Sequence, residues 1–199
     1  LALIHHPLAF ESGLSAENAK KLHASERAAL AAARGVLVTS AATGRHLVAD
    51  YAVPAERIFV VPPGSDPVSL APGSNDAVVR LLSVGALVPR KGFDVLIAAL
   101  ATLIELPWRL TIAGDRTRDP QVAAQLDADI AHHALGDRIV VAGEVSAQHL
   151  EKLYVDADVF TLASRFEGYG MAYAEAIAHG LPVVGTSAGA IPDTVPRGA

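Results

Sequence analysis

The sequence contains no cysteine. A chain without cysteine cannot build a disulfide framework, use a thiolate nucleophile or bind zinc or an iron–sulfur cluster through sulfur. This composition suits a reducing compartment, and we expect a cytoplasmic protein. The sequence also lacks the Gly-x-Gly-x-x-Gly motif after a strand, which argues against a Rossmann dehydrogenase.

Clusters of basic residues and long apolar runs are absent as well. The 16 lysines and arginines are scattered among 21 acidic residues, and the net charge of -5 argues against a nucleic-acid partner. The longest apolar stretch, 95–106, is interrupted by Glu105 and is too short to cross a bilayer. No charged-then-apolar signal segment opens the chain. We therefore expect a soluble protein, peripheral at the inner face of a membrane at most.

What the sequence does contain is a regular alternation of predicted strands and helices over its 199 residues. Helices are predicted at 15–34, 40–51, 92–106, 120–135, 146–155 and 170–179, and strands at 36–39, 58–61, 81–84, 109–113, 138–141, 159–162 and 182–184. Short, uniformly apolar strands between helices predict an α/β fold with parallel sheets covered by helices on both sides. In such sheets ligands bind at the carboxyl ends of the strands.

A proline-rich segment divides this pattern. Residues 62–77 include Pro62, Pro63, Pro67 and Pro72 with glycines and serines between them, a composition that resists regular structure. We predict part of a first domain at 1–65, a linker at 66–77 and a second domain at 78–199. Because the chain begins at Leu1 and ends on a proline- and glycine-rich run, we expect a fragment.

The stretch from Ser164 to Glu175 runs from a strand end through a glycine loop into a predicted helix. Gly168 and Gly170 would let the backbone approach a ligand closely. The N–H groups of Tyr169, Gly170 and Met171 at the helix start favour a phosphate. The loop therefore predicts an anion-binding site.

Two carboxylates flank this helix start. Glu167 precedes the helix and Glu175 lies inside it, so one could bind sugar hydroxyls while the other reaches ribose hydroxyls. The alternative is an ordinary loop carboxylate and a solvated helix residue, and spacing alone leaves it open.

A second stretch, 84–92, also runs from a strand through a glycine turn, at Gly85, to a helix start. Arg90 and Lys91 place cations where a diphosphate leaving group would need its charge neutralised. By themselves, two basic residues in a loop are equally compatible with solvated surface.

Together with residues 38–66, the segments 81–100 and 166–193 resemble glycosyltransferase family 4, and the resemblance covers almost the whole chain. It includes the Glu-x7-Glu signature of that family. The resemblance implies the GT-B architecture of two Rossmann-like domains with parallel sheets, the first incomplete in this sequence.

The resemblance also implies roles for individual residues. Glu167 would contact the donor sugar, Glu175 the ribose and Lys91 the diphosphate. The backbone amides of the glycine loop would bind phosphates and sugar, and a further segment would lie near the base: Gly143, Glu144 and Val145. The family often has arginine where this sequence has Ala86, so either Arg90 replaces it or phosphate binding is weaker. Asp193 stands where many members have glutamate, and its role is left open.

The amino-terminal segment resembles the strand end where the family places a histidine facing the donor sugar, and His6 aligns better than His5. Glu11 and Ser12 follow on the same loop, where they could meet an acceptor.

No convincing metal site appears in the sequence. His132, His133 and His149 lack zinc-site spacing, and the Asp-x-Asp pairs at 127–129 and 156–158 fall in a helix and before a strand. Enzymes of the resembled family generally need no metal, so we expect no cofactor.

These observations predict a retaining glycosyltransferase that moves a sugar from a UDP- or GDP-sugar to a hydroxyl of a glycan or glycolipid, in glycan, exopolysaccharide or glycolipid synthesis. A nucleotide-sugar 2-epimerase of the same architecture, or a nucleotide-binding module without catalysis, are the alternatives. With most of the first domain missing, we expect this chain alone to bind donor without turnover.

Overall fold

The computed structural model describes residues 1–74 and 76–196, which form two compact units. The first unit contains residues 1–64, 166–171 and 187–196, and the second contains 65–74, 76–165 and 172–186. The break at residues 64 and 65 falls at the start of the predicted linker, and the predicted domain limits stay predictions. No helix in the described part of the chain has the length and apolar character needed to cross a membrane.

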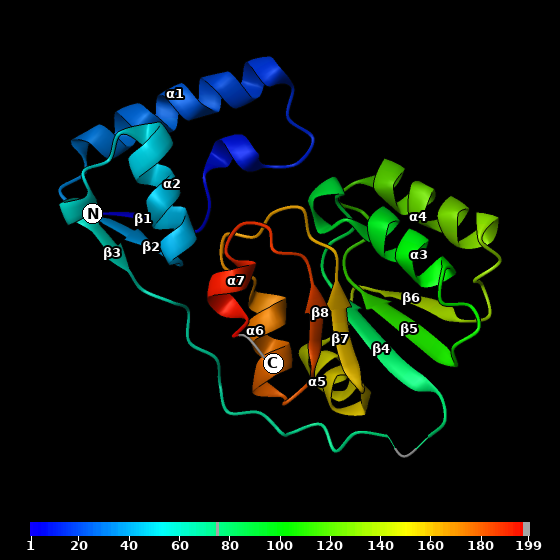
Figure 1. The fold of residues 1–199 in the computed structure, drawn as a ribbon. Helices are drawn as coiled ribbons and strands as arrows, with labels where there is room; N and C mark the ends of the chain where they lie inside the picture. Colours follow the sequence, from blue (N-terminus) through cyan, green and yellow to red (C-terminus); the bar gives the residue numbers. More distant parts are fainter. Residues whose placement is uncertain (75, 197–199) are drawn as a thin grey trace. The chain divides into compact units, whose positions relative to one another are not determined.

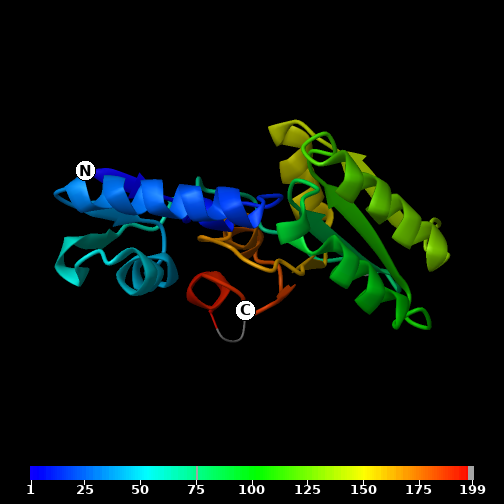
Figure 2. The same ribbon diagram turned by 90° about the horizontal axis from the view of Figure 1, so that it is seen from above.

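The first unit is built on a small parallel sheet. Its strands lie in the order β1 (Ala2–Ile4), β2 (Val36–Val38) and β3 (Ile58–Val60). The helices α1 (Ala16–Ala32) and α2 (Ala41–Tyr51) connect the strands and contact each other (Figures 1 and 2). Short helices complete the unit: η1 (Leu8–Phe10), η2 (Ala55–Arg57) and α7 (Ile191–Thr194).

Alternation along the short strands decides which face of the first sheet is buried. Val36 and Val38 are fully buried with Leu30 and Leu47 in one core cluster. The neighbouring row, formed by Leu3, Leu37 and Phe59, points to the opposite face, and Leu3 and Phe59 are 58% and 53% exposed. The prediction of helices on both faces therefore does not hold for the described residues of this sheet.

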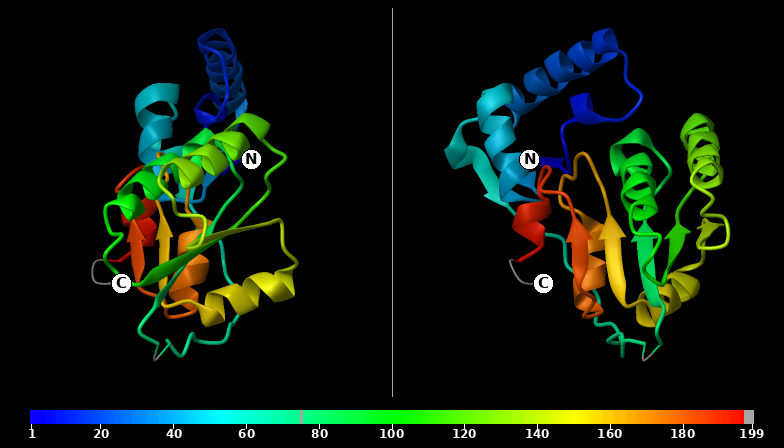
Figure 3. Two further views of the ribbon diagram at one scale, coloured as in Figure 1. Left: turned by 90° about the vertical axis from the view of Figure 1, so that its right-hand side faces the viewer. Right: turned by 45° about the vertical axis from the view of Figure 1, so that its right-hand side comes forward.

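The second unit contains a five-stranded parallel sheet in the order β6-β5-β4-β7-β8. Its strands are β4 (Val79–Val84), β5 (Trp108–Ala113), β6 (Ile139–Gly143), β7 (Val159–Leu162) and β8 (Val183–Gly185), and its helices are α3 (Phe93–Ala101), α4 (Pro120–His132), α5 (Ala147–Asp156) and α6 (Met171–Ala178), with the short η3 (Pro89–Lys91). Because the chain proceeds outward from β4 to β6 and then returns through β7 to β8, right-handed connections place α3 and α4 on one face and α5 and α6 on the other (Figures 1 and 3). The predicted parallel α/β fold is confirmed.

The main difference from the predicted elements concerns α3. The sequence predicts a helix to residue 106, but α3 ends at Ala101 and turns follow. Pro107 disfavours helical backbone at the residue before it, and the Trp108 indole N–H donates to the carbonyl of Leu103 at 2.9 Å, which holds the turn. Residues 102–106 of the apolar run therefore lie outside the helix, in the turns that follow α3.

Candidate functional site

The glycine loop is packed more tightly than ligand access alone would require. A Cβ added to Gly168 would lie 2.2 Å from the His5 carbonyl oxygen and 2.8 Å from the His6 Cβ. Gly170 adopts a φ of 95°, a conformation that L side chains rarely take. Position 168 therefore has no room for a side chain, because the backbone of His5 lies against it. This reason for a glycine differs from the predicted one, which was the close approach of a ligand.

Helix α6 begins at Met171, directly after this loop. The first N–H groups of an α-helix have no partner inside the helix, and they carry the positive end of its dipole. Tyr169, Gly170 and Met171 occupy this helix start as predicted. The geometry can therefore bind an anion.

Glu167 is not an ordinary solvated loop residue, because it is only 6% exposed. Its carbonyl accepts the Ala190 N–H at 2.9 Å, and the residue lines a cavity of about 440 Å³ in the first unit. The other walls of this cavity include Arg45 and His46 of α2 and Phe166. A carboxylate in this position can accept hydrogen bonds from the hydroxyls of a small polar ligand.

Glu175 is half-buried on α6 of the second unit, where Tyr154 of α5 holds it. The Tyr154 hydroxyl donates to a carboxylate oxygen of Glu175 at 2.9 Å and lies 3.3 Å from the Ala172 carbonyl. Burial raises the pKa of Tyr154, and the neighbouring Glu175 raises it further, so this hydroxyl remains a donor. The alternative of a simply solvated Glu175 does not fit this arrangement.

Lys91 lies in the second unit at the end of the turn that begins with Gly85. A Cβ added to Gly85 would lie 2.9 Å from the Lys91 Cε, so the missing side chain makes room for the lysine stem. Gly85 donates its N–H to the Ala113 carbonyl at 2.9 Å, and Gly114 donates to the Gly143 carbonyl at 2.8 Å. These bonds join the carboxyl ends of three strands, where the predicted base-binding segment also begins.

An ion pair that no sequence pattern predicts holds the backbone around Lys91. Arg165 contacts both carboxylate oxygens of Asp94 at 2.9 and 2.6 Å, and also donates to the Pro89 carbonyl at 2.7 Å. The backbone N–H of Arg165 donates to the backbone carbonyl of Arg90 at 2.8 Å, and Arg90 is half-buried. The hydrogen bond from Arg165 holds the pKa of Asp94 below its ordinary value. Two residues 71 positions apart thus fix the basic loop.

Val145 is half-buried, directly before Ser146, whose hydroxyl caps α5 by accepting the His149 N–H at 3.2 Å. Gly143 ends β6 with a φ of 72°, and Glu144 is exposed. The segment therefore leaves the carboxyl edge of the sheet and enters a helix, as its predicted place near the base requires.

His6 belongs to the first unit, as do Glu167 and the glycine loop. Its Nε2 lies 3.0 Å from a carboxylate oxygen of Glu11, and its ring centroid is 6.4 Å from that of Phe166. Glu11, which the sequence suggested as an acceptor contact, is thus a partner of His6.

The aspartate and histidine pairs with apparent metal spacing have other contacts. Asp127 pairs with Arg116 at 2.5 Å, and the exposed His132 and His133 stand at the end of α4. Asp158 accepts the Arg80 N–H at 2.8 Å and the Ser74 N–H at 2.5 Å. Within 1–74 and 76–196, no group of three metal-ligating residues is close enough to hold an ion.

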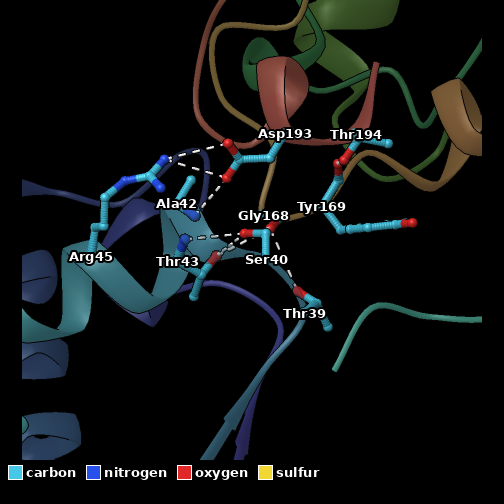
Figure 4. A network of polar contacts seen from close by, with 9 residues as sticks. All are labelled: Thr39, Ser40, Ala42, Thr43, Arg45, Gly168, Tyr169, Asp193 and Thr194. Carbon is cyan, nitrogen blue, oxygen red and sulfur yellow. Dashed lines mark hydrogen bonds and ion pairs between the residues drawn. The ribbon is translucent and has the colours of Figure 1, made fainter. Parts of the chain in front are cut away.

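Asp193, whose role the sequence left open, contacts α2. Its carboxylate accepts the Ala42 N–H at 2.8 Å and lies 3.3 Å from the Arg45 guanidinium (Figure 4). A carboxylate at the start of a helix is stabilised by the free N–H groups there. No sequence signal connects positions 151 residues apart, so this contact could not have been found from spacing.

Comparison with known proteins places these features in a family. The family described as glycosyl transferases group 1 matches residues 78–199. Mannosylfructose-phosphate synthase of Agrobacterium fabrum is 30% identical over 73% of this chain and 36% of its own length. D-inositol 3-phosphate glycosyltransferase of Xylanimonas cellulosilytica is 32% identical over 83% of this chain and 43% of its own length. The chain thus spans less than half of these two relatives.

Solved structures match the fold. HepE of Anabaena, in complex with UDP and glucose, aligns with 100% of this chain and 55% of its own at a TM-score of 0.83 and 22% identity. Sucrose-phosphate synthase of Thermosynechococcus elongatus aligns with 98% of this chain and 51% of its own, at a TM-score of 0.81 and 24% identity. These matches confirm the predicted GT-B fold class. Since the family match covers more than half of the chain, the protein belongs to the glycosyl transferases group 1 family.

Proposed function

We propose that this protein is a retaining glycosyltransferase of family 4 that transfers a sugar from a UDP- or GDP-sugar to a hydroxyl of a glycan or glycolipid. The observation that carries the proposal is the pair of carboxylates around the start of α6, one buried in the loop and one held by a tyrosine. HepE, a structure of the same fold, is named as binding UDP and glucose, and the relatives named above include glycosyltransferases.

In this proposal each group has a distinct task. The amides at the start of α6 and the Lys91 ammonium stabilise the charge that develops on the departing diphosphate, so no metal is required. Glu167 orients the donor sugar through its hydroxyls, Glu175 binds the ribose and His6 faces the sugar. The departing phosphate accepts the proton of the acceptor hydroxyl as that hydroxyl attacks the same face of the sugar.

Titration with nucleotides tests the donor site. We expect calorimetry with UDP, GDP and ADP, in the presence of EDTA, to show selective binding of one of them. Lys91→Ala should weaken that binding by about 10- to 100-fold, because hydrogen bonds to charged groups contribute about 1.5–3 kcal/mol. Lys152→Ala removes the same charge from an exposed position on α5 and should have no effect.

The same titration, combined with assays for sugar transfer and for conversion of the nucleotide sugar, separates the alternatives. Nucleotide binding without sugar transfer by any longer protein that contains this chain would favour a non-catalytic module. Conversion of the nucleotide sugar without an acceptor would favour the epimerase. Equal losses in Lys91→Ala and Lys152→Ala would contradict the assignment of Lys91.

Tyr154→Phe tests the ribose contact. We expect the affinity for the preferred nucleotide to fall about 3- to 10-fold, because the carboxylate of Glu175 loses the hydrogen bond that orients it. Binding of the 2′,3′-dideoxy form of the same nucleotide should not change, since that form lacks the hydroxyls that Glu175 would bind. An equal loss for both forms would mean that Tyr154 acts through the fold alone.

A further inference from the structure

Hydroxyl groups converge on the glycine loop from the first turn of α2 and the residues directly before it. The Ser40 hydroxyl donates to the Gly168 carbonyl at 2.6 Å, and the Thr43 hydroxyl donates to the same oxygen at 3.1 Å (Figure 4). Thr39 lies farther from this oxygen, at 3.4 Å, and is closer to the His5 carbonyl, at 3.1 Å. Ser40, Thr43 and Gly168 are all buried.

The available protons and lone pairs fit this assignment. The single hydroxyl proton of Ser40 has two acceptors in reach, the Gly168 carbonyl at 2.6 Å and the Thr43 hydroxyl oxygen at 3.0 Å, and the shorter contact assigns it to Gly168. The Ser40 oxygen accepts the Thr43 N–H at 3.0 Å. Thr43 then supplies its own hydroxyl proton. The carbonyl oxygen of Gly168 has two lone pairs, and the two hydroxyls use both. Ser40 therefore has two tasks: it caps α2 and it fixes the peptide between Gly168 and Tyr169.

The next peptide is fixed from α7. The Thr194 hydroxyl donates to the Tyr169 carbonyl at 2.5 Å, and Asp193 attaches this helix to α2 through the Ala42 N–H (Figure 4). Two consecutive carbonyls of the glycine loop thus have dedicated hydroxyl donors, both from the first unit.

Fixing a carbonyl also fixes the amide of the following residue. The described peptides are trans, and in a trans peptide the C=O and the next N–H point in opposite directions within one plane. The donors on Gly168 therefore turn the Tyr169 N–H away from Ser40 and Thr43, and the donor on Tyr169 turns the Gly170 N–H away from Thr194.

We propose that Ser40, Thr43 and Thr194 form a hydroxyl clamp: positioning residues that orient the Tyr169 and Gly170 amides toward the phosphates or sugar of the donor. This inference rests on the proposed function, because it assigns the ligand of those amides. The clamp does not touch the donor. It sets in advance the orientation of amides in a glycine-rich backbone, whose φ and ψ angles are otherwise less restricted.

Single substitutions in the whole chain test the clamp. Ser40→Ala removes a donor and a helix cap, whereas Thr194→Val is nearly isosteric and removes only a donor. Ser15→Ala is the matched control, because Ser15 caps α1 in the same way, accepting the Asn18 N–H at 3.2 Å. Nitrogen-15 relaxation should give order parameters near 0.85 for Tyr169 and Gly170 in the parent and control, and values falling toward 0.6 in the two clamp variants.

Ligand binding supplies the second measurement, with UDP and GDP against uridine and guanosine as probes. We expect both clamp variants to bind the preferred nucleoside diphosphate about tenfold more weakly and its nucleoside unchanged, since only the diphosphate would meet the amides. Unchanged order parameters overturn the clamp, and so does a loosened loop with undiminished diphosphate affinity. If the parent chain, and any longer protein that contains it, binds neither diphosphate, the proposed function fails, and the relaxation data alone decide whether the hydroxyls hold the loop.

Discussion

Replacing Gly92 with alanine should destabilise the second unit by about 2–5 kcal/mol. Gly92 has a φ of 63°, where a residue with a Cβ costs about 1–2 kcal/mol. The new Cβ would also lie 2.1 Å from the Ala163 carbonyl oxygen, and relieving such overpacking costs about 1–3 kcal/mol. Urea unfolding measures the loss through Trp108, the single tryptophan, which is buried in β5 of this unit.

Gly143→Ala separates the two causes. Gly143 has a similar φ of 72°, but nothing lies within 4 Å of its missing Cβ. This variant should therefore lose only the conformational part, about 1–2 kcal/mol. If both variants lost the same stability, the contact with Ala163 would contribute nothing, and the segment that follows β7 would have moved to admit the methyl group.

Gly92 also shows which features of the fold could be predicted from the sequence and which could not. Its position at a strand–turn–helix junction could be predicted, because a buried strand and an amphipathic helix have different periodicities and a glycine lies between them. The reason that only glycine fits could not be predicted, since Ala163, directly after β7, is 71 residues away in the sequence. The sequence places Ser40 at the start of a predicted helix, but the bond from its hydroxyl to Gly168, 128 residues away, depends on the tertiary fold.

The candidate site divides in the same way. The local pattern of strand, glycine and helix start predicts where the paired carboxylates and the basic loop lie, and the resemblance to glycosyltransferase family 4 supplies the roles expected of them. Their supporting residues, Tyr154 beside Glu175 and Arg165 beside Asp94, have no such pattern. A hydrogen bond between positions 21 or 71 residues apart leaves no periodicity in a single sequence. Residues that would meet a ligand were therefore easier to predict than the residues that hold them.

Replacing Glu167 with glutamine should lower kcat/KM for sugar transfer by about 100-fold. Glu167 is 6% exposed as a residue and lines a cavity, and glutamine keeps the shape of its side chain while removing the charge. Hydrogen bonds from sugar hydroxyls to a charged acceptor contribute about 1.5–3 kcal/mol, so their weakening accounts for a loss of this size. The measurement requires an acceptor and a protein in which the first domain is complete.

The affinity for nucleoside diphosphate gives this prediction its control. Glu167→Gln should bind UDP or GDP as the parent does, because neither contains a sugar at the position that Glu167 would meet. Lys91→Ala should show the opposite pattern, with diphosphate binding already weakened. Transfer at the parental rate in Glu167→Gln would show that the buried carboxylate belongs to the packing of the loop. Tighter diphosphate binding in Glu167→Gln would instead place the carboxylate at the phosphates, where its negative charge repels the ligand.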